Sequence, residues 1–152
     1  MIKIICVGKV KQDWIGEAIA QYETYLSKYT KVTWIECKEA DSSLPKEKRL
    51  EEEARSILKH IDDTDKVFLL SEHGTTYDSP AFAKLLEIEV DQGSHMTWII
   101  GGTFGLGEQL YKRAEYLVSL SPLTFPHLMC RVIFLEQLFR AFTIMKSSDY
   151  HY

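Results

Sequence analysis

Trp98-Ile99-Ile100-Gly101-Gly102-Thr103-Phe104-Gly105-Leu106 is an apolar run that ends in a cluster of glycines. The run predicts a buried strand over residues 95–100, and the glycines predict a loop whose backbone can approach a ligand closely. The segment Ser119-Leu120-Ser121-Pro122-Leu123-Thr124-Phe125-Pro126-His127 follows and holds hydroxyl groups and two prolines. Two such stiff loops in succession predict a pocket for a small molecule.

Strand and helix patterns alternate along the rest of the chain. Buried or alternating apolar runs predict strands at Ile2–Val7, Val32–Cys37, 67–70 and 116–120. Helical spacing predicts helices at 13–29, at 46–61, from Ser79, at Glu108–Arg113 and from Pro126 to Lys146. Asp13 is expected to cap the first helix, and Glu72-His73-Gly74 is expected to turn the chain. The pattern predicts one α/β domain over residues 1–152, a three-layer sandwich with a mostly parallel sheet.

A parallel sheet also predicts where a ligand binds. In such sheets ligands bind beyond the carboxyl ends of the strands. The loops after Leu70, Ile100 and Leu120 all fall at that edge. We therefore expect three separate loops to converge on one cleft.

Composition excludes several classes of protein. The chain of 152 residues is 45% hydrophobic and 26% charged, as expected of a globular domain with a full core. Its net charge of −4 argues against non-specific nucleic-acid binding driven by bulk charge. The three cysteines and five histidines are scattered, so neither a disulfide framework nor a metal site is expected, and a reducing cytoplasm is the simplest compartment. No apolar run approaches the ~20 residues that span a bilayer.

The glycine loop fits neither common nucleotide-binding motif. A phosphate-binding P-loop needs Lys and Ser or Thr after its last glycine, but Gly107 is followed by Glu108-Gln109. The dinucleotide fingerprint needs a different glycine spacing after the first strand, which disfavours a Rossmann-type oxidoreductase. A tight turn that packs a helix on the sheet remains an alternative. Similarly, Ser121 and Thr124 could cap the following helix instead of contacting a ligand.

The last helix and the residues after it carry further candidates. A stripe of apolar residues predicts its buried face: Val132, Leu135, Leu138, Phe139 and Phe142. Glu136 and Arg140 are four residues apart and can pair, which is also a common surface arrangement. Tyr150 and His151 can stack on an unpaired base, and His151 can exchange a proton near neutral pH. A frayed chain end is the alternative.

Taken together, these segments resemble the small SPOUT-class methyltransferases that modify large-subunit ribosomal RNA, and among them the methyltransferase H family. The resemblance covers essentially the whole chain and is densest after residue 98. It rests on these residues: Val7-Gly8-Lys9, Ile100-Gly101-Gly102, Gly105-Leu106, Ser119 to His127, Arg131-Val132, Glu136-Gln137-Leu138, Arg140-Ala141 and Tyr150-His151.

The resemblance implies a fold, a cofactor, a substrate and partners. It implies a C-terminal trefoil knot, S-adenosyl-L-methionine as cofactor, no metal, and a cytoplasmic homodimer without membrane contact. It implies methylation at N3 of a pseudouridine in 23S rRNA within the assembled ribosome. The implied cofactor-binding residues are Leu70, Gly101, Gly102, Leu120, Ser121, Pro122, Leu123, Thr124 and Phe125. The implied catalytic and RNA-facing residues are His127, Arg131, Glu136, Arg140, Tyr150 and His151.

One departure from the family pattern and one alternative function remain. Members of the family commonly carry a basic residue after the Tyr-His pair, whereas this chain has Tyr152. Nitrogen methylation needs a base to take the ring proton, and the candidates are His151 and Glu136, with Arg140 holding the carboxylate or a phosphate. The alternative is a non-catalytic nucleotide-binding module for ribosome assembly, which has no need of Tyr150-His151.

Overall fold

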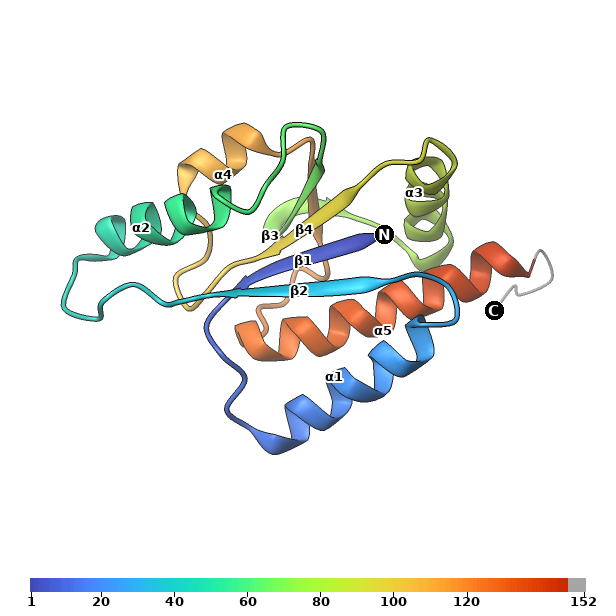
Figure 1. The fold of residues 1–152 in the computed structure, drawn as a ribbon, viewed down its shortest axis with the longest axis horizontal. Helices are drawn as coiled ribbons and strands as arrows, with labels where there is room; N and C mark the ends of the chain where they lie inside the picture. The colour runs from blue at the N-terminus through green and yellow to red at the C-terminus, as the bar shows by residue number, and fades with distance from the viewer. Residues whose placement is uncertain (148–152) are drawn as a thin grey trace.

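Five parallel strands form the central sheet of the computed structural model, which describes residues 1–147 (Figure 1). The strands are β1 (Ile2–Val7), β2 (Val32–Cys37), β3 (Lys66–Thr76), β4 (Met96–Ile100) and β5 (Tyr116–Ser119). Their order across the sheet is β2-β1-β4-β3-β5, and every neighbouring pair is parallel. The predicted parallel sheet is therefore confirmed.

Helices cover both faces of this sheet. They are α1 (Asp13–Leu26), α2 (Lys46–Leu58), α3 (Ser79–Asp91), α4 (Glu108–Arg113) and α5 (His127–Lys146). Figure 1 shows α1 and α5 side by side on one face and α2 with α4 on the other. Helix α3 packs beside α5. The layering follows from the chain order, because consecutive crossovers between parallel strands lie on alternate faces here.

Alternating side chains of the strands divide the core into two clusters. Ile4 and Cys6 of β1 face α1, α3 and α5, whereas Ile5 and Val7 face α2 and α4. The first cluster is the more aromatic. At its centre the Phe68 ring is stacked between Trp98, at a centroid distance of 4.3 Å, and Tyr116, at 4.6 Å. Burial of both faces explains why the central strands β1 and β4 are almost entirely apolar in sequence.

Two helices are shorter than predicted, and one cap differs. The helices predicted to reach residues 29 and 61 end at Leu26 and Leu58. Beyond these ends the chain forms turns, in which the Tyr29 and Ile61 nitrogens donate to the carbonyl oxygen three residues earlier. The expectation that Asp13 caps α1 is wrong. Gln12 is the N-cap residue, and Asp13 lies in the first turn, where a carboxylate is favoured by the helix dipole.

Strand β3 differs most from the sequence-based expectation. The predicted turn at Glu72-His73-Gly74 is wrong, because the strand continues to Thr76. Leu70 and Thr75 both pair with Val118, so the residues between them bulge out of the ladder. A Cβ atom at Gly74 would lie 2.6 Å from the Val118 nitrogen, so only glycine allows the two backbones to pass. The bulge carries polar side chains to the carboxyl edge of the sheet.

Within residues 1–147, none of the helices has the length and apolar character needed to cross a membrane.

Candidate functional site

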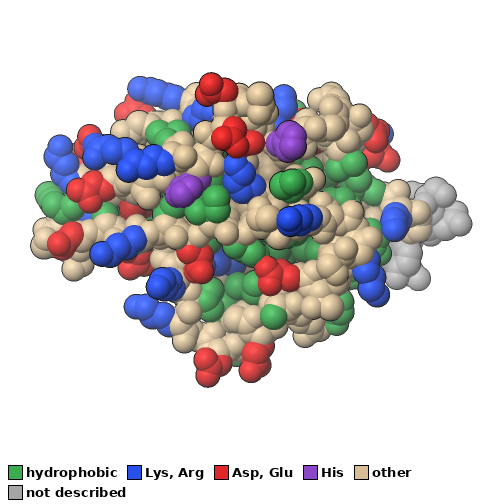
Figure 2. Space-filling view, in the orientation of Figure 1, with side chains coloured by type: hydrophobic (Ala, Val, Ile, Leu, Met, Phe, Trp, Pro, Cys, Tyr) green, Lys and Arg blue, Asp and Glu red, His purple; other side chains and the backbone are tan. Residues whose placement is uncertain are grey.

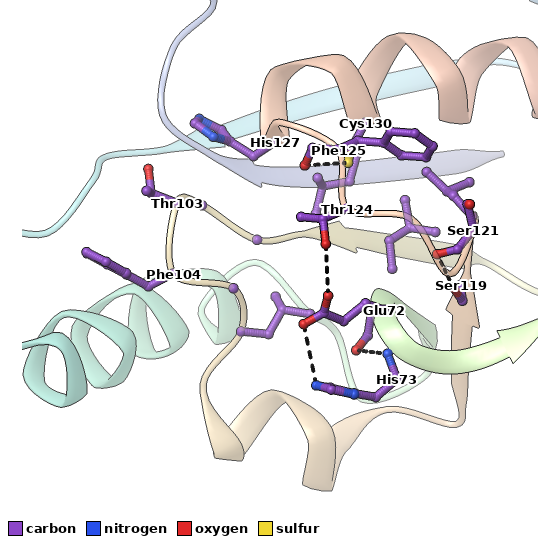
Figure 3. A pocket seen from close by; sticks show the side chains of 18 of the residues that line it. Glu72, His73, Thr103, Phe104, Ser119, Ser121, Thr124, Phe125, His127 and Cys130 are labelled. Atoms are coloured by element: carbon purple, nitrogen blue, oxygen red, sulfur yellow. Dashed lines mark hydrogen bonds and ion pairs between the residues drawn. The ribbon is translucent and has the colours of Figure 1, made fainter.

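A cavity of about 560 Å³ lies at the carboxyl edge of β3, β4 and β5 (Figure 3). Its walls come from the segments that follow Leu70, Ile100 and Ser119, together with the start of α5. The three segments therefore converge on one cleft as predicted, although the segment after Leu70 is a bulged part of β3 and not a loop. The position also follows the general rule for ligand sites in parallel sheets.

The glycine loop after β4 folds back tightly on itself. Gly105 has a φ of +89°, and its nitrogen donates a hydrogen bond to the Gly102 oxygen at 3.1 Å. A Cβ atom at Gly101 would lie 2.5 Å from the Gly105 oxygen, and one at Gly102 would lie 3.2 Å from Val7 Cγ1. Because Gly101, Gly102 and Gly105 also line the cavity, the loop is both a tight packing turn and a pocket wall.

The hydroxyl groups of the 119–125 segment hold the segment itself. Ser119 Oγ donates to the Ser121 oxygen at 3.0 Å, and Ser121 Oγ accepts from the Leu123 nitrogen at 3.0 Å. Thr124 Oγ1 reaches Glu72 Oε2 at 3.5 Å and so connects this segment to the β3 bulge (Figure 3). Helix capping by Ser121 and Thr124 is not what the structure shows, because Pro126 is the N-cap residue of α5 and no side chain caps the helix.

The bulge of β3 adds lining residues that the sequence analysis did not identify. Ser71 and Tyr111 share a hydroxyl–hydroxyl hydrogen bond of 2.9 Å, and Ser71 Oγ also accepts from the His73 nitrogen at 3.2 Å. Glu72 Oε1 lies 3.6 Å from His73 Nε2. The signal that could have found them is Gly74, because a glycine inside a strand pattern often marks a bulge.

Helix α5 contributes His127 and Cys130 to the cavity. Burial, and then the nearby positive charge of Arg131, lower the pKa of His127 below its usual value of 6.5. The imidazole is therefore neutral at pH 7. Burial raises the pKa of the Cys130 thiol, and Cys130 Sγ lies 3.9 Å from the Phe125 oxygen, to which it donates. The thiol is thus protonated and poorly nucleophilic.

Arg131 lies in the protein interior and does not line the cavity. Its side chain is 2% exposed, and Nη2 donates to the oxygens of Val7 at 2.8 Å and Gly8 at 2.7 Å. Nη1 lies 3.2 Å from Glu36 Oε2. These contacts join the end of β1 to α5. The position suits a residue that orients the site from behind, and the structure does not bring it to a surface that RNA could reach.

The other implied catalytic residues lie elsewhere on α5 or outside the described residues. Arg140 Nη2 and Glu136 Oε1 form an ion pair of 2.7 Å, and Gln137 donates to the second oxygen of Glu136. Neither Glu136 nor Arg140 lines the cavity. Tyr150 and His151 lie outside residues 1–147. Of the four implied residues within 1–147, the structure therefore brings only His127 to the cavity.

Eight of the nine implied cofactor-binding residues line the cavity: Leu70, Gly101, Gly102, Leu120, Ser121, Leu123, Thr124 and Phe125. Pro122 is exposed and is not among the lining residues. Across residues 1–147, the structure brings no three His, Cys, Asp or Glu side chains close enough to hold a metal ion.

Comparison with known proteins gives a consistent family. The family described as "Predicted SPOUT methyltransferase" matches residues 1–151. The chain is 42% identical to ribosomal RNA large subunit methyltransferase H of Caldicellulosiruptor saccharolyticus, covering 99% of each chain. It is 39% identical to the protein of that name from Streptococcus uberis, covering 99% of this chain and 98% of the relative. The Pseudothermotoga lettingae protein is also 39% identical, over 99% of both chains.

Solved structures agree at the level of the fold. A methylase family protein from Neisseria gonorrhoeae superposes with a TM-score of 0.56 at 15% identity, over 91% of this chain and 81% of that chain. At this identity the likeness establishes the fold alone, whereas the full-length sequence matches establish the family. The chain belongs to the SPOUT methyltransferases, in the ribosomal RNA large subunit methyltransferase H family.

Proposed function

We propose that this protein transfers a methyl group from S-adenosylmethionine to N3 of a pseudouridine in 23S rRNA, on the assembled ribosome. The observation that carries the proposal is the full-length match to ribosomal RNA large subunit methyltransferase H proteins. The cavity supports it, because eight of the nine residues implied for cofactor binding line it. We further propose that the enzyme works in the cytoplasm as a homodimer.

The cavity fits such a donor in size and in chemistry. Its volume of about 560 Å³ lies within the range of ~300–1,000 Å³ typical of small-molecule sites. Gly101 and Gly102 expose backbone in its wall, and Leu70, Leu120 and Phe125 supply apolar surface. The Glu72 carboxylate in the cavity wall would attract a ligand that carries a sulfonium and an ammonium group. When bound, S-adenosylmethionine supplies an electrophilic methyl group.

The chain's own residues supply alignment and exclusion of water. The hydrogen bonds within the 119–125 segment and the Thr124–Glu72 contact hold two walls of the cavity at a fixed separation. Such positioning is the main contribution that a direct displacement requires. The neutral His127 imidazole can accept a hydrogen bond at the cavity wall without repelling a cationic donor.

Proton removal is assigned to residues away from the cavity. Glu136 or His151 is proposed as the base that takes the N3 proton, with Arg140 and Tyr150 holding the RNA and Arg131 orienting α5. Because Glu136 and Arg140 do not line the cavity of their own chain, a second copy supplying them explains why the pair faces outward. We also propose that the chain forms the family's trefoil knot, which would hold the 101–107 and 119–125 loops together.

The test combines ligand titration with methyl transfer. Calorimetry should show binding of S-adenosylmethionine and none of ATP or NAD. Ribosomes that lack the modification should gain one methyl group on the pseudouridine, measured by mass spectrometry of digested nucleosides, whereas free 23S rRNA should react poorly. Donor binding without transfer to ribosomes would instead support the nucleotide-binding assembly module. Equal activity on free rRNA would contradict the requirement for an assembled ribosome.

A further inference from the structure

Phe104, at the tip of the glycine loop, is an exposed aromatic residue at the rim of the cavity. The residue is 42% exposed, although it is large and apolar. Figure 3 shows it at the same end of the cavity as Thr103 and His127, away from Ser119 and Ser121. It comes directly from the loop that lines the proposed donor site, so a ligand on its ring would lie next to that site.

Two cations of α2 flank the ring. The Arg49 guanidinium carbon lies 4.7 Å from the ring centroid, and Lys46 Nζ lies 5.9 Å from it. Both distances fall within the range of a cation–π interaction, which holds the ring against the start of α2. We call Lys46, Arg49 and Phe104 the Phe104 platform.

Neither cation of the platform is held in an ion pair within the described part of the chain. Lys46 and Arg49 lie at the N-terminal end of α2, where the helix dipole disfavours cations. Among residues 1–147 neither forms a salt bridge, and the buried Nε of Arg49 has no hydrogen-bond partner. Asp41 is close enough for the Arg49 charge to contribute to lowering its pKa, but the two form no ion pair. Such an arrangement is stabilised when an anion binds.

The platform also separates two hollows in the surface. Lys46 and Phe104 line the donor cavity, whereas Arg49 lines a neighbouring cavity of about 1040 Å³ at the carboxyl ends of β1 and β2. Lys9 and Lys11 line this second cavity, together with acidic residues. Figure 2 shows that Lys and Arg side chains lie over α2 with Asp and Glu between them. The attraction for an anion is therefore local, in agreement with a negative net charge.

An aromatic face flanked by cations is the chemistry that binds single-stranded nucleic acid, because bases stack on the ring and phosphates meet the cations. We propose that the Phe104 platform stacks a base adjacent to the methylated nucleotide and contacts its phosphate. This inference rests on the proposed function. It assigns Phe104, Arg49 and Lys46 as positioning residues that select an unpaired, accessible nucleotide.

The test compares Phe104→Ala, Phe104→Trp and Arg49→Gln with two matched controls. Ile88→Ala removes an equally exposed apolar side chain on α3, and Arg55→Gln removes a cation from α2 outside both cavities. Phe104→Ala should raise the KM for ribosomes about tenfold, since stacking one base on a protein ring is commonly this strong. Phe104→Trp should restore the KM. Arg49→Gln should reduce the slope of log(kcat/KM) against log[salt] by about one, as expected for one lost phosphate contact.

Two further readouts decide between explanations. The Kd for S-adenosylmethionine should stay within twofold of wild type in Phe104→Ala; a tenfold weaker donor affinity would overturn the proposal and make Phe104 a wall of the donor site. Anisotropy of a labelled single-stranded oligoribonucleotide tests the platform without methyl transfer. If wild type binds this RNA and Phe104→Ala does not, the platform stands even where transfer fails. If Phe104→Ala matches Ile88→Ala in both KM and RNA affinity, the platform does not bind RNA.

Discussion

Arg131 Nη2 donates to the backbone oxygen of Gly8 at 2.7 Å, across a sequence separation of 123 residues. The same nitrogen donates to Val7, and Nη1 meets Glu36 at the edge of this buried contact. A single guanidinium thus satisfies two carbonyl groups at the end of β1 and fixes the first half of α5 against them. His127, one turn earlier on α5, and Cys130, directly before Arg131, take their positions at the cavity from this anchor.

Replacing Arg131 by leucine should destabilise the fold by about 3 kcal/mol. The change leaves two buried carbonyl oxygens without donors, each costing ~1–3 kcal/mol. Glu36 adds less, because its side chain is 42% exposed and can be hydrated. Chemical denaturation measures the loss. The free energy of unfolding of Arg131→Lys should lie between those of wild type and Arg131→Leu, because an ammonium cannot reach all three acceptors.

Arg55→Leu is the matched control for this loss, because Arg55 pairs with Glu51 on the surface of α2. Exposed pairs contribute ~0–1 kcal/mol, so its effect should be small. If Arg131→Leu were no more destabilising than Arg55→Leu, the anchoring role of Arg131 would be contradicted.

Gly101→Ala should weaken donor binding by at least about tenfold. The new Cβ would lie 2.5 Å from the Gly105 oxygen, so the loop must open. Overpacking of this kind costs ~1–3 kcal/mol. Calorimetry with S-adenosylmethionine measures the affinity. Gly16→Ala is the control, because its nearest neighbour would be Val10 Cγ1 at 4.0 Å and alanine favours the α1 helix. Equal affinities for the two variants would argue against a donor seated on this loop.

Stability should fall at acidic pH partly through His127. Its pKa is lowered in the folded state by burial and then by Arg131, with Glu39 and Glu53 acting in the opposite direction. The unfolded chain therefore binds the proton more readily, so the free energy of unfolding is unaffected well above pH 6.5 and decreases as pH falls below it. The free energy of unfolding of His127→Gln should decrease less between pH 7.5 and 5.5 than that of wild type. A wild-type profile for His127→Gln would contradict this origin.

Glu72→Gln should weaken S-adenosylmethionine binding about threefold. The Glu72 side chain is 57% exposed, so solvent screens its attraction for a cationic ligand to ~0.2–1 kcal/mol. The effect should shrink in high salt. Glu87→Gln on α3 removes an equivalent surface charge outside the cavity and should leave the affinity unchanged. A loss above a hundredfold would mean that Glu72 contacts the ligand in a dehydrated environment.

The order and type of the elements could be predicted from the sequence, because apolar periodicity and proline positions report on local structure. The path of β3 could not. Its bulge depends on pairing between Thr75 and Val118 and on the close passage of Gly74 beside β5, and both are contacts between distant segments. The sequence therefore predicts a turn at Glu72 and His73, whereas the structure places both in β3 and in the cavity wall.

The loops of the site could be predicted from the sequence, whereas the roles of individual side chains on α5 could not. Glycines and prolines mark loops wherever they occur, so the walls around Gly101 and Thr124 were found. The spacing of two residues on a helix predicts whether they share a face of that helix, but not what each side chain contacts. His127 and Arg131 are four residues apart on α5, yet one lines the cavity and the other is buried against β1.

The bulge of β3 places ligand-facing groups and sheet hydrogen bonds in one strand. Strand β5 is an edge strand that pairs with β3 alone, so it has fewer constraints than the central strands. A donor in the cavity that contacts both the β3 bulge and the 119–125 segment would tighten this edge and slow its transient opening. The amide hydrogens of Tyr116–Ser119 should therefore exchange with deuterium more slowly as the donor is added. The exchange rate of this edge strand would thus report the fraction of protein that has donor bound.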